Sequence, residues 1–205
     1  MSHHTVAHTA LAVTLVAALC GCLGPREVQP VQRYAIHPDI AAPDAPATEY
    51  TLGVRPLVSS LPYGLRMVYL EGRHRLGTLP AAEWGEQPAE AVTRALVDAL
   101  TASGRFQDVG DAANMNRPDY ILTGDLRRFH ENRTGQPWTA EIEVRLELRA
   151  AMGTANPWSA TLHEAIPVEN GAEATPADFA AAMNTAISNI AARTAEAAAG
   201  APLEK

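Results

Sequence analysis

The chain has 205 residues, of which 47% are hydrophobic and 19% are charged, and its formal net charge is −7. This length and composition predict one ordinary globular domain and exclude a chain that is disordered throughout. Because the Lys and Arg residues are scattered through an acidic chain, no basic face of the kind that binds phosphate backbones is expected. Nucleic acid is therefore not a predicted partner.

The N-terminus has the pattern of an export signal. Residues 10–19 form an apolar run that is too short to span a membrane but suits the apolar region of a signal peptide. Leu19, Cys20, Gly21 and Cys22 follow, and together they resemble the lipobox of bacterial lipoproteins. We expect cleavage after Gly21 and lipidation of Cys22. Since no Lys or Arg precedes residue 10, a non-exported protein with an apolar N-terminus remains the alternative.

The cysteines agree with this interpretation. Both lie in the lipobox region, so a mature chain would keep only Cys22, which excludes a disulfide, a thiol nucleophile and a cysteine-bound metal in the folded part. Leu23 rather than Asp follows the cysteine, which in the bacterial lipoprotein pathway favours the outer membrane. The predicted organisation is a signal peptide at 1–21, a lipidated N-terminus and tether at 22–32, and one domain at 33–200.

The first half of that domain combines short strands with one helix. Strands are predicted at 33–37, 50–57 and 65–70, and a tight turn at 71–74 leads into another strand at 75–79. Pro88 suits the first turn of a helix, whose apolar residues Val92, Leu96, Ala99 and Leu100 recur at helical spacing. Gly104 stands where a left-handed residue is expected after the helix, and a short strand is predicted at 106–109.

The second half predicts a meander and a final helix. Residues 138–150 alternate strictly between apolar and polar, which indicates a strand with one buried and one wet face and hence antiparallel pairing. The flanking strands are predicted at 120–130 and 158–168. A second helix is expected at about 176–198, with Thr175 as its N-cap and Asp178 three residues on. The predicted fold class is α+β, a two-layer domain with an antiparallel sheet and two helices packed on one face.

Several segments of this chain resemble the ABC-type transport auxiliary lipoproteins, the lipoprotein partners of mammalian-cell-entry (MCE) domain lipid-transport systems. The segments are RYAIHP, the long run from LGVRPL to RALVDAL, RFQDV, PDYILTGDLRRFH and WTAEIEVRLEL. The most specific points are the turn at Leu61-Pro62-Tyr63, the arm at Arg75-Leu76, the lead from Trp84 to Pro88, and Phe129. One departure is Gly64-Leu65-Arg66, where members often carry Leu-Asp-Arg-Pro.

The resemblance implies a non-enzymatic subunit that is anchored in the bacterial envelope, faces the periplasm and helps to carry lipids between the membranes. Its implied partners are an MCE-domain protein with its ABC permease and ATPase. Some members assemble as rings, so a homo-oligomeric ring is implied as well. A structural lipoprotein of a secretion or polysaccharide-export complex is the alternative, and an envelope hydrolase is a third hypothesis.

The residues themselves offer little sign of catalysis. No nucleophile elbow, phosphate loop, dinucleotide fingerprint or His-Glu-x-x-His motif occurs, and His37, His74, His130 and His163 have no metal-ligand spacing. Glu141, Glu143 and Glu147 share one strand face with Arg145 and Arg149, which predicts a solvated face with ion pairs. We therefore expect no enzymatic activity, no metal and no cofactor.

Four apolar residues in predicted connections are candidates for a partner interface. Leu61, Pro62 and Tyr63 lie between two strands, and Trp84 precedes the first helix. Exposed apolar and aromatic side chains near loops often contact partners. The alternative is that Tyr63 and Trp84 cover the end of the core.

Overall fold

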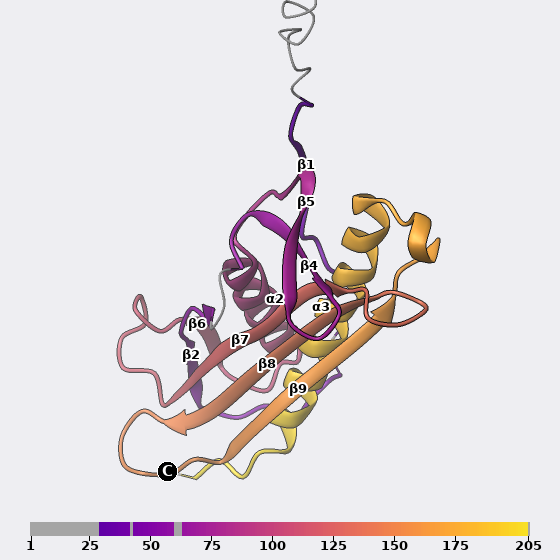
Figure 1. Ribbon diagram of the computed structural model, residues 1–205. Helices are drawn as coiled ribbons and strands as arrows, with labels where there is room; N and C mark the ends of the chain where they lie inside the picture. The colour runs from indigo at the N-terminus through magenta and orange to yellow at the C-terminus, as the bar shows by residue number, and fades with distance from the viewer. Residues whose placement is uncertain (1–28, 42, 60–62, 205) are drawn as a thin grey trace, which may run out of the picture. The chain divides into compact units, whose positions relative to one another are not determined.

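A computed structural model describes residues 29–41, 43–59 and 63–204 of the chain (Figure 1). The predicted signal peptide, the cleavage after Gly21 and the lipidation of Cys22 lie outside these residues, as do Leu61 and Pro62. Val31–Lys205 form one compact unit. Within the described ranges, none of the helices combines the length and the hydropathy needed to span a membrane.

Every predicted strand and helix is present, most with bounds within a few residues. In chain order the elements are β1 Gln32–Tyr34, β2 Thr51–Val54, β3 Val58–Ser59, β4 Arg66–Glu71, β5 Arg75–Trp84, α2 Pro88–Ala102, β6 Asp108–Asp111, β7 Tyr120–Asn132, β8 Thr139–Ala150, β9 Trp158–Pro167, the short 3-10 helix η1 Gly171–Glu173, and α3 Pro176–Gly200. The strand β3 was not expected, and β5 is longer than predicted because it continues to Trp84.

The sheet is organised around β7, the longest strand. Along one side β7 pairs with β8 in antiparallel register, and β8 pairs with β9 in the same way, which confirms the predicted meander. On the other side β7 pairs in turn with β2, β3 and β4, all in parallel. At Gly124 a side chain could not fit, since a Cβ would lie 2.3 Å from the carbonyl oxygen of Arg145. The α+β class is thus confirmed, and the sheet also contains parallel pairs that the sequence pattern did not reveal.

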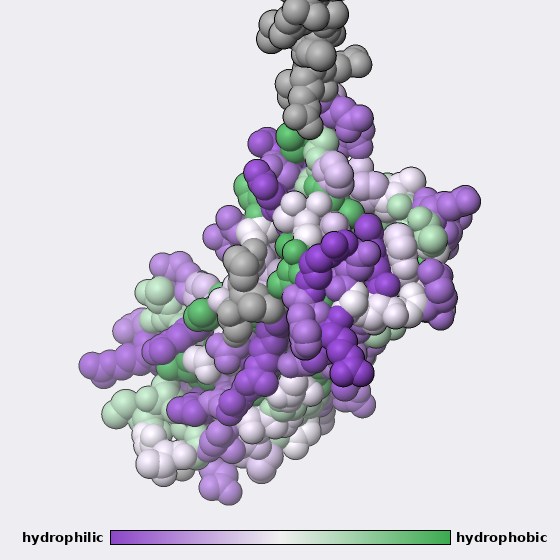
Figure 2. All heavy atoms as spheres, in the orientation of Figure 1, coloured by the Kyte–Doolittle hydropathy of each residue, from purple (hydrophilic) through white to green (hydrophobic). Residues whose placement is uncertain are grey.

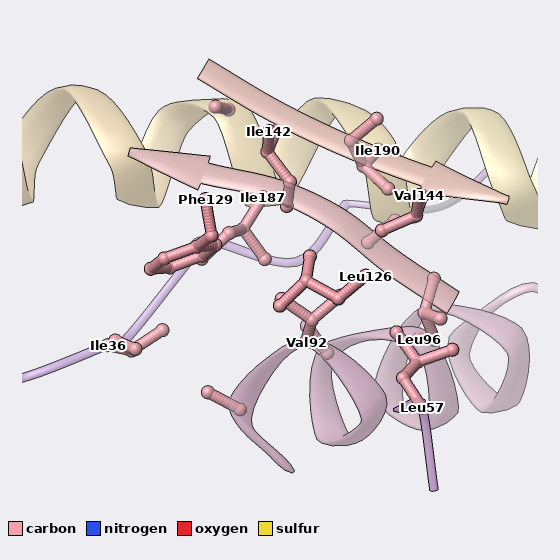
Figure 3. Packing of buried hydrophobic residues seen from close by; sticks show 14 of the residues in the cluster. Ile36, Leu57, Val92, Leu96, Leu126, Phe129, Ile142, Val144, Ile187 and Ile190 are labelled. Atoms are coloured by element: carbon pink, nitrogen blue, oxygen red, sulfur yellow. The ribbon is translucent and has the colours of Figure 1, made fainter. Parts of the chain in front are cut away.

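Both helices cover one face of the sheet (Figure 1). The inward face of β8 consists of Ala140, Ile142, Val144, Leu146 and Leu148, all fully buried, as the alternation predicted. Figure 3 shows Ile142 and Val144 directed at Ile187 and Ile190 of α3, with Val92 and Leu96 of α2 nearby. Because these apolar side chains leave water together, their burial supplies the main force that holds the two layers.

The helix ends follow the predicted local signals. Pro88 occupies the start of α2, and Gly104, just beyond the helix, has a left-handed φ of 64°. At α3 the hydroxyl of Thr175 accepts a hydrogen bond from the backbone N–H of Asp178, while the Asp178 carboxylate accepts one from the N–H of Thr175. This reciprocal arrangement is a capping box, which satisfies backbone groups that the helix leaves unpaired.

Candidate functional site

Trp84 lies in the core and not at the surface. Its relative exposure is 1%, and its ring makes edge-to-face contacts with Phe129 of β7 at 5.4 Å and Phe179 of α3 at 5.5 Å. Trp84 is the last residue of β5, and its ring therefore packs the sheet against α3. The expectation that Trp84 is exposed is wrong, because the last residues of β5 continue the sheet and turn this side chain towards the helices.

Tyr63 is also buried, with 5% relative exposure, so the expectation of an exposed aromatic is wrong here too. Its ring stacks on the imidazole of His130 at 6.1 Å, and its hydroxyl shares a 3.0 Å hydrogen bond with His130 Nδ1. Burial raises the pKa of the Tyr63 hydroxyl. The contact holds the end of the β3–β4 connection against β7.

His130 belongs to a polar network on the sheet face opposite the helices. Directly across from it on β8 stands Glu141, whose Oε2 lies 3.4 Å from Nε2 of the imidazole. That distance marks an electrostatic contact rather than a well-aligned hydrogen bond, and the nitrogen is shielded from solvent. Asn132 donates a 2.8 Å hydrogen bond to the other oxygen of Glu141, and Arg128 Nη1 lies 3.6 Å from Oε2. The carboxylate is thus surrounded by donors.

These donors stabilise the charged form of Glu141. The imidazole of His130 contributes most, Asn132 adds a hydrogen bond, and together they lower the pKa of Glu141 from 4.5 to about 2 even though burial opposes the shift. Only 11% of the Glu141 side chain is exposed, so water screens these interactions weakly. The network is therefore held together by charge at neutral pH.

The geometry of this network suits a structural role better than proton transfer. One nitrogen of His130 binds Tyr63 and the other faces Glu141, so neither is open to a substrate. His130 is 4% exposed, whereas His37, His74 and His163 are exposed. Through His130, the network holds Tyr63, at the end of the β3–β4 connection, against β7 and β8.

The rest of this sheet face is charged and solvated. Arg145 and Arg149 both pair with Glu147 along β8, and Arg128 reaches across from β7 to Glu143 at 3.4 Å. Figure 2 shows hydrophilic residues gathered in a band over β7 and β8. The predicted cross-strand ion pairing is confirmed by Arg128 and Glu143. In the described parts of the chain, no group of three or more His, Cys, Asp or Glu residues is placed to hold a metal ion.

A second buried ion pair closes one end of the core. Glu131 of β7 is 1% exposed and pairs with Arg133 at 2.5 Å. Burial raises the pKa of Glu131 while Arg133 opposes the rise. The guanidinium of Arg133 lies 4.3 Å from the ring centres of both Tyr69 and Trp138, an arrangement that adds cation–π attraction. The Glu131 carboxylate is enclosed, whereas 21% of the Arg133 side chain is exposed. The pair stabilises the packing of β4 against the meander.

An open hollow lies at the end of the sheet where β7 begins and β8 ends. It has a volume of about 630 Å³, and most of its lining is apolar, with Tyr50, Tyr120 and Met152 on its walls. The rings of Tyr50 and Tyr120 meet edge to face at 5.3 Å, and the hydroxyl of Tyr120 donates to the carbonyl of Glu204. Met152 is 88% exposed.

Sequence reasoning identified Tyr63 but missed the network it enters. His130 was considered only as a metal ligand, and Arg128 and Asn132 were not considered. A bulge between Leu126 and Arg128 shifts which β7 residues face outward. The alternation of apolar and polar residues in β8 was visible in the sequence, and it correctly placed Glu141 on the polar face. Had the bulge been known, the same alternation would have placed His130 on the outer face, where Glu141 lies.

Comparisons with known proteins agree with this fold. The family model described as ABC-type transport auxiliary lipoprotein component matches residues 43–195. No curated protein matches the sequence. Protein XCC0632 from Xanthomonas campestris, described with the family DUF330, is similar at 22% identity and a TM-score of 0.70, covering 82% of this chain and 97% of that one.

Two further solved structures are similar at lower levels. A crystal structure described as an uncharacterized protein has 12% identity and a TM-score of 0.61, covering 82% of this chain and 98% of that one. A PelC dodecamer from Paraburkholderia phytofirmans has 17% identity and a TM-score of 0.47, covering 75% of this chain and 92% of that one. At such identities the likeness concerns the fold.

Proposed function

The chain belongs to the ABC-type transport auxiliary lipoprotein component family, and from this premise we propose that it is a non-enzymatic accessory subunit of an MCE-type ABC transport system that carries lipids between the envelope membranes. The observation that carries the proposal is the family match, which extends from before β2 into the last turns of α3 and so includes nearly the whole sheet. Transfer of function along a family is analogy, so partner recovery is the decisive test.

The described sheet face supports a role in assembly. Its buried histidine directs one ring nitrogen at the Tyr63 hydroxyl and the other at the Glu141 carboxylate, and its carboxylates lie beside arginine, asparagine or histidine. A general base needs a nitrogen or oxygen within reach of a substrate proton, and the ring nitrogens of the buried His130 face protein groups. The network fixes the shape of the surface instead, which is what a docking subunit needs.

The anchor belongs to the same proposal. We expect Gly21 to be the last residue of the signal peptide and Cys22 to carry the lipid, with the outer membrane as the site of anchoring because Leu23 follows the cysteine. One acyl chain binds a membrane only weakly, whereas two or more hold a protein there stably. The protein would then face the periplasm.

The test is affinity purification of the tagged protein from crosslinked, detergent-solubilised envelopes, followed by identification of the partners by mass spectrometry. Recovery of an MCE-domain protein with its permease and ATPase is expected, and Cys22→Ala should weaken it. The matched control is Cys20→Ala, since residue 20 sits two positions before the cleavage site and tolerates a small residue. Recovery of a secretion or polysaccharide-export channel, the alternative function, would contradict the proposal.

Two further proposals concern contacts. Leu61 and Pro62 remain candidates for the partner interface, and a Leu61→Asp variant should lower the recovery of the transport proteins. Tyr63 and Trp84 are not suitable for such a test because both are buried.

Self-association into a ring would appear as an integral multiple of the subunit mass in light scattering of the purified protein. A monomer at all concentrations would contradict the ring.

A further inference from the structure

The chain that would lead to the lipid joins the sheet directly. β1 pairs in parallel with the end of β5, so that Gln32 stands beside Ala82 and Tyr34 beside Trp84. The backbone N–H of Gly85 donates to the carbonyl of Tyr34 at 2.8 Å. The segment from Gln32 to Tyr34 is therefore part of the folded domain and not of a free linker.

The next residues are fastened to both helices. Ile36 is 2% exposed, and its carbonyl accepts a 3.1 Å hydrogen bond from Arg94 of α2. Asn184 of α3 accepts from the backbone N–H of His37 at 2.7 Å and donates to the carbonyl of Ala35 at 3.3 Å. A pull on the chain at Val31 would consequently be transmitted to the sheet and to both helices.

Beside β1 the strand β5 forms a wide bulge. Arg66 of β4 pairs with Glu83 and Val68 pairs with Thr78, so one residue of β4 is matched by four residues of β5. These four residues, 79–82, have no partner on β4, although Ala82 still pairs with Gln32 of β1, and Ala81 has a left-handed φ of 50°. Leu79 and Ala82 are buried, whereas Pro80 is exposed. Within the bulge, Pro80 is therefore the residue that faces solvent.

The bulge and the first residues of β1 make one small surface, the bulge tip, consisting of Val31, Arg33, Arg66, Pro80 and Ala81. Val31, Arg66, Pro80 and Ala81 line a common shallow hollow, and Val31 is 54% exposed. The side chain of Arg33 is 71% exposed and lies 3.7 Å from Glu83, while no carboxylate of the described residues pairs with Arg66. Glu83 also lines this hollow and offsets one of the two arginines, so one net positive charge remains beside the exposed apolar side chains. Such a surface suits the boundary of a membrane with anionic headgroups.

The length of the chain limits where this tip can be. Eight residues lie between Cys22 and Val31, which makes nine steps along the chain. A fully extended chain covers about 3.3–3.6 Å per step, so Val31 can be no more than about 30 Å from the lipidated residue. That is about the thickness of one hydrocarbon core. No other part of the folded domain is tied so closely to the anchor.

We propose that the bulge tip is a membrane contact: Val31, Pro80 and Ala81 rest in the headgroup region, and Arg33 and Arg66 face lipid phosphates. The inference rests on the proposed lipidation of Cys22. An apolar patch this small would not bind a membrane by itself, but the anchor raises its local concentration at the surface, which makes a weak contact effective. The β8–β9 connection with Met152, at the opposite end of the sheet from β1 in Figure 1, then points away from the membrane.

The test relies on site-specific labelling of a single cysteine. In the proposed mature protein Cys20 has been removed and Cys22 is acylated, so no free thiol competes for the label. Pro80→Cys and Met152→Cys each introduce a single reactive cysteine, one at the tip and one at the far end, which can be labelled with an environment-sensitive fluorophore. The labelled, lipidated proteins are placed in phosphatidylethanolamine and phosphatidylglycerol vesicles that contain lipids with a headgroup nitroxide quencher. Val31→Cys provides a second probe of the tip in case Pro80→Cys alters the fold.

We expect a several-fold larger loss of emission at position 80, and at position 31, than at position 152. Replacing Arg33 and Arg66 together with glutamate should reduce quenching at the tip without changing position 152. Equal quenching at both ends, or stronger quenching at position 152, would overturn the inference while leaving the anchor intact. If mass spectrometry found no acyl groups on Cys22, the proposed anchoring would fail first, and this inference would fail with it.

Discussion

Replacing Glu141 with glutamine would remove the charge at the centre of the network on β7 and β8. The carboxylate has a folded-state pKa of about 2, against an ordinary value of 4.5, chiefly because of the imidazole of His130 and the amide of Asn132. A lowered pKa means that the folded state favours the ionised form, so the group contributes stability above pH 4.5. That contribution disappears as the pH falls from 4.5 towards 2.

The magnitude follows from the size of this shift. Each unit of pKa corresponds to about 1.4 kcal/mol, so a change from 4.5 to about 2 corresponds to on the order of 3 kcal/mol. Only 11% of the side chain is exposed, which leaves little room for solvent screening. Other carboxylates whose pKa is lowered, those of Glu147 and Asp178, are present in both proteins and cancel when the two are compared.

The assay is urea unfolding of the mature protein and of the Glu141→Gln variant between pH 2 and pH 7, followed by tryptophan fluorescence. The difference in the free energy of unfolding should be largest near pH 7 and should shrink as the pH falls below 4.5. Glu143→Gln is the matched control, since this residue lies two positions along the same strand and contacts a half-exposed arginine; its effect should stay below about 1 kcal/mol. Parallel pH profiles for the wild type and Glu141→Gln would refute the reasoning.

Three further changes test the core and the helix start by the same unfolding measurement at neutral pH. Trp84→Ala should cost about 3–5 kcal/mol, because it empties the contact between Phe129 and Phe179, and a loss below about 1 kcal/mol would show that the ring is not packed as described. Arg133→Ala should cost about 3–5 kcal/mol, since it leaves Glu131 buried without a partner, and additional removal of the charge by Glu131→Gln should restore part of the loss. Thr175→Ala should cost about 1 kcal/mol through loss of the capping box, while Thr185→Ala in the middle of α3 serves as its control and should have a smaller effect.

The hydrogen bonds of residues 35–37 to the two helices affect how the domain is oriented relative to its membrane anchor. An anchor attached through a long free linker would leave the orientation of the domain undefined, whereas β1 places the exit of the chain at a fixed point of the sheet. A partner subunit would then meet the same face of the domain each time. The proposed membrane contact and the proposed docking role are in this respect compatible.

Features that depend on near neighbours along the chain could be predicted from the amino-acid sequence. The alternation at 138–150 fixed which residues of β8 face the helices, and Thr175 with Asp178 fixed the start of α3. The signals work because side chains alternate in a strand with a period of two and because a cap satisfies backbone groups within one turn. Both rules need only local information.

The tertiary structure alone decided which distant segments meet. The parallel pairing of β2, β3 and β4 with β7, the burial of Tyr63 and Trp84, and the facing of His130 and Glu141 all depend on the register between strands that lie far apart in the chain. One bulge in β7 shifts that register and turns His130 to the outer face. Such a shift reverses the face of every residue beyond it, and no periodicity in a single strand reports which partner it will pair with.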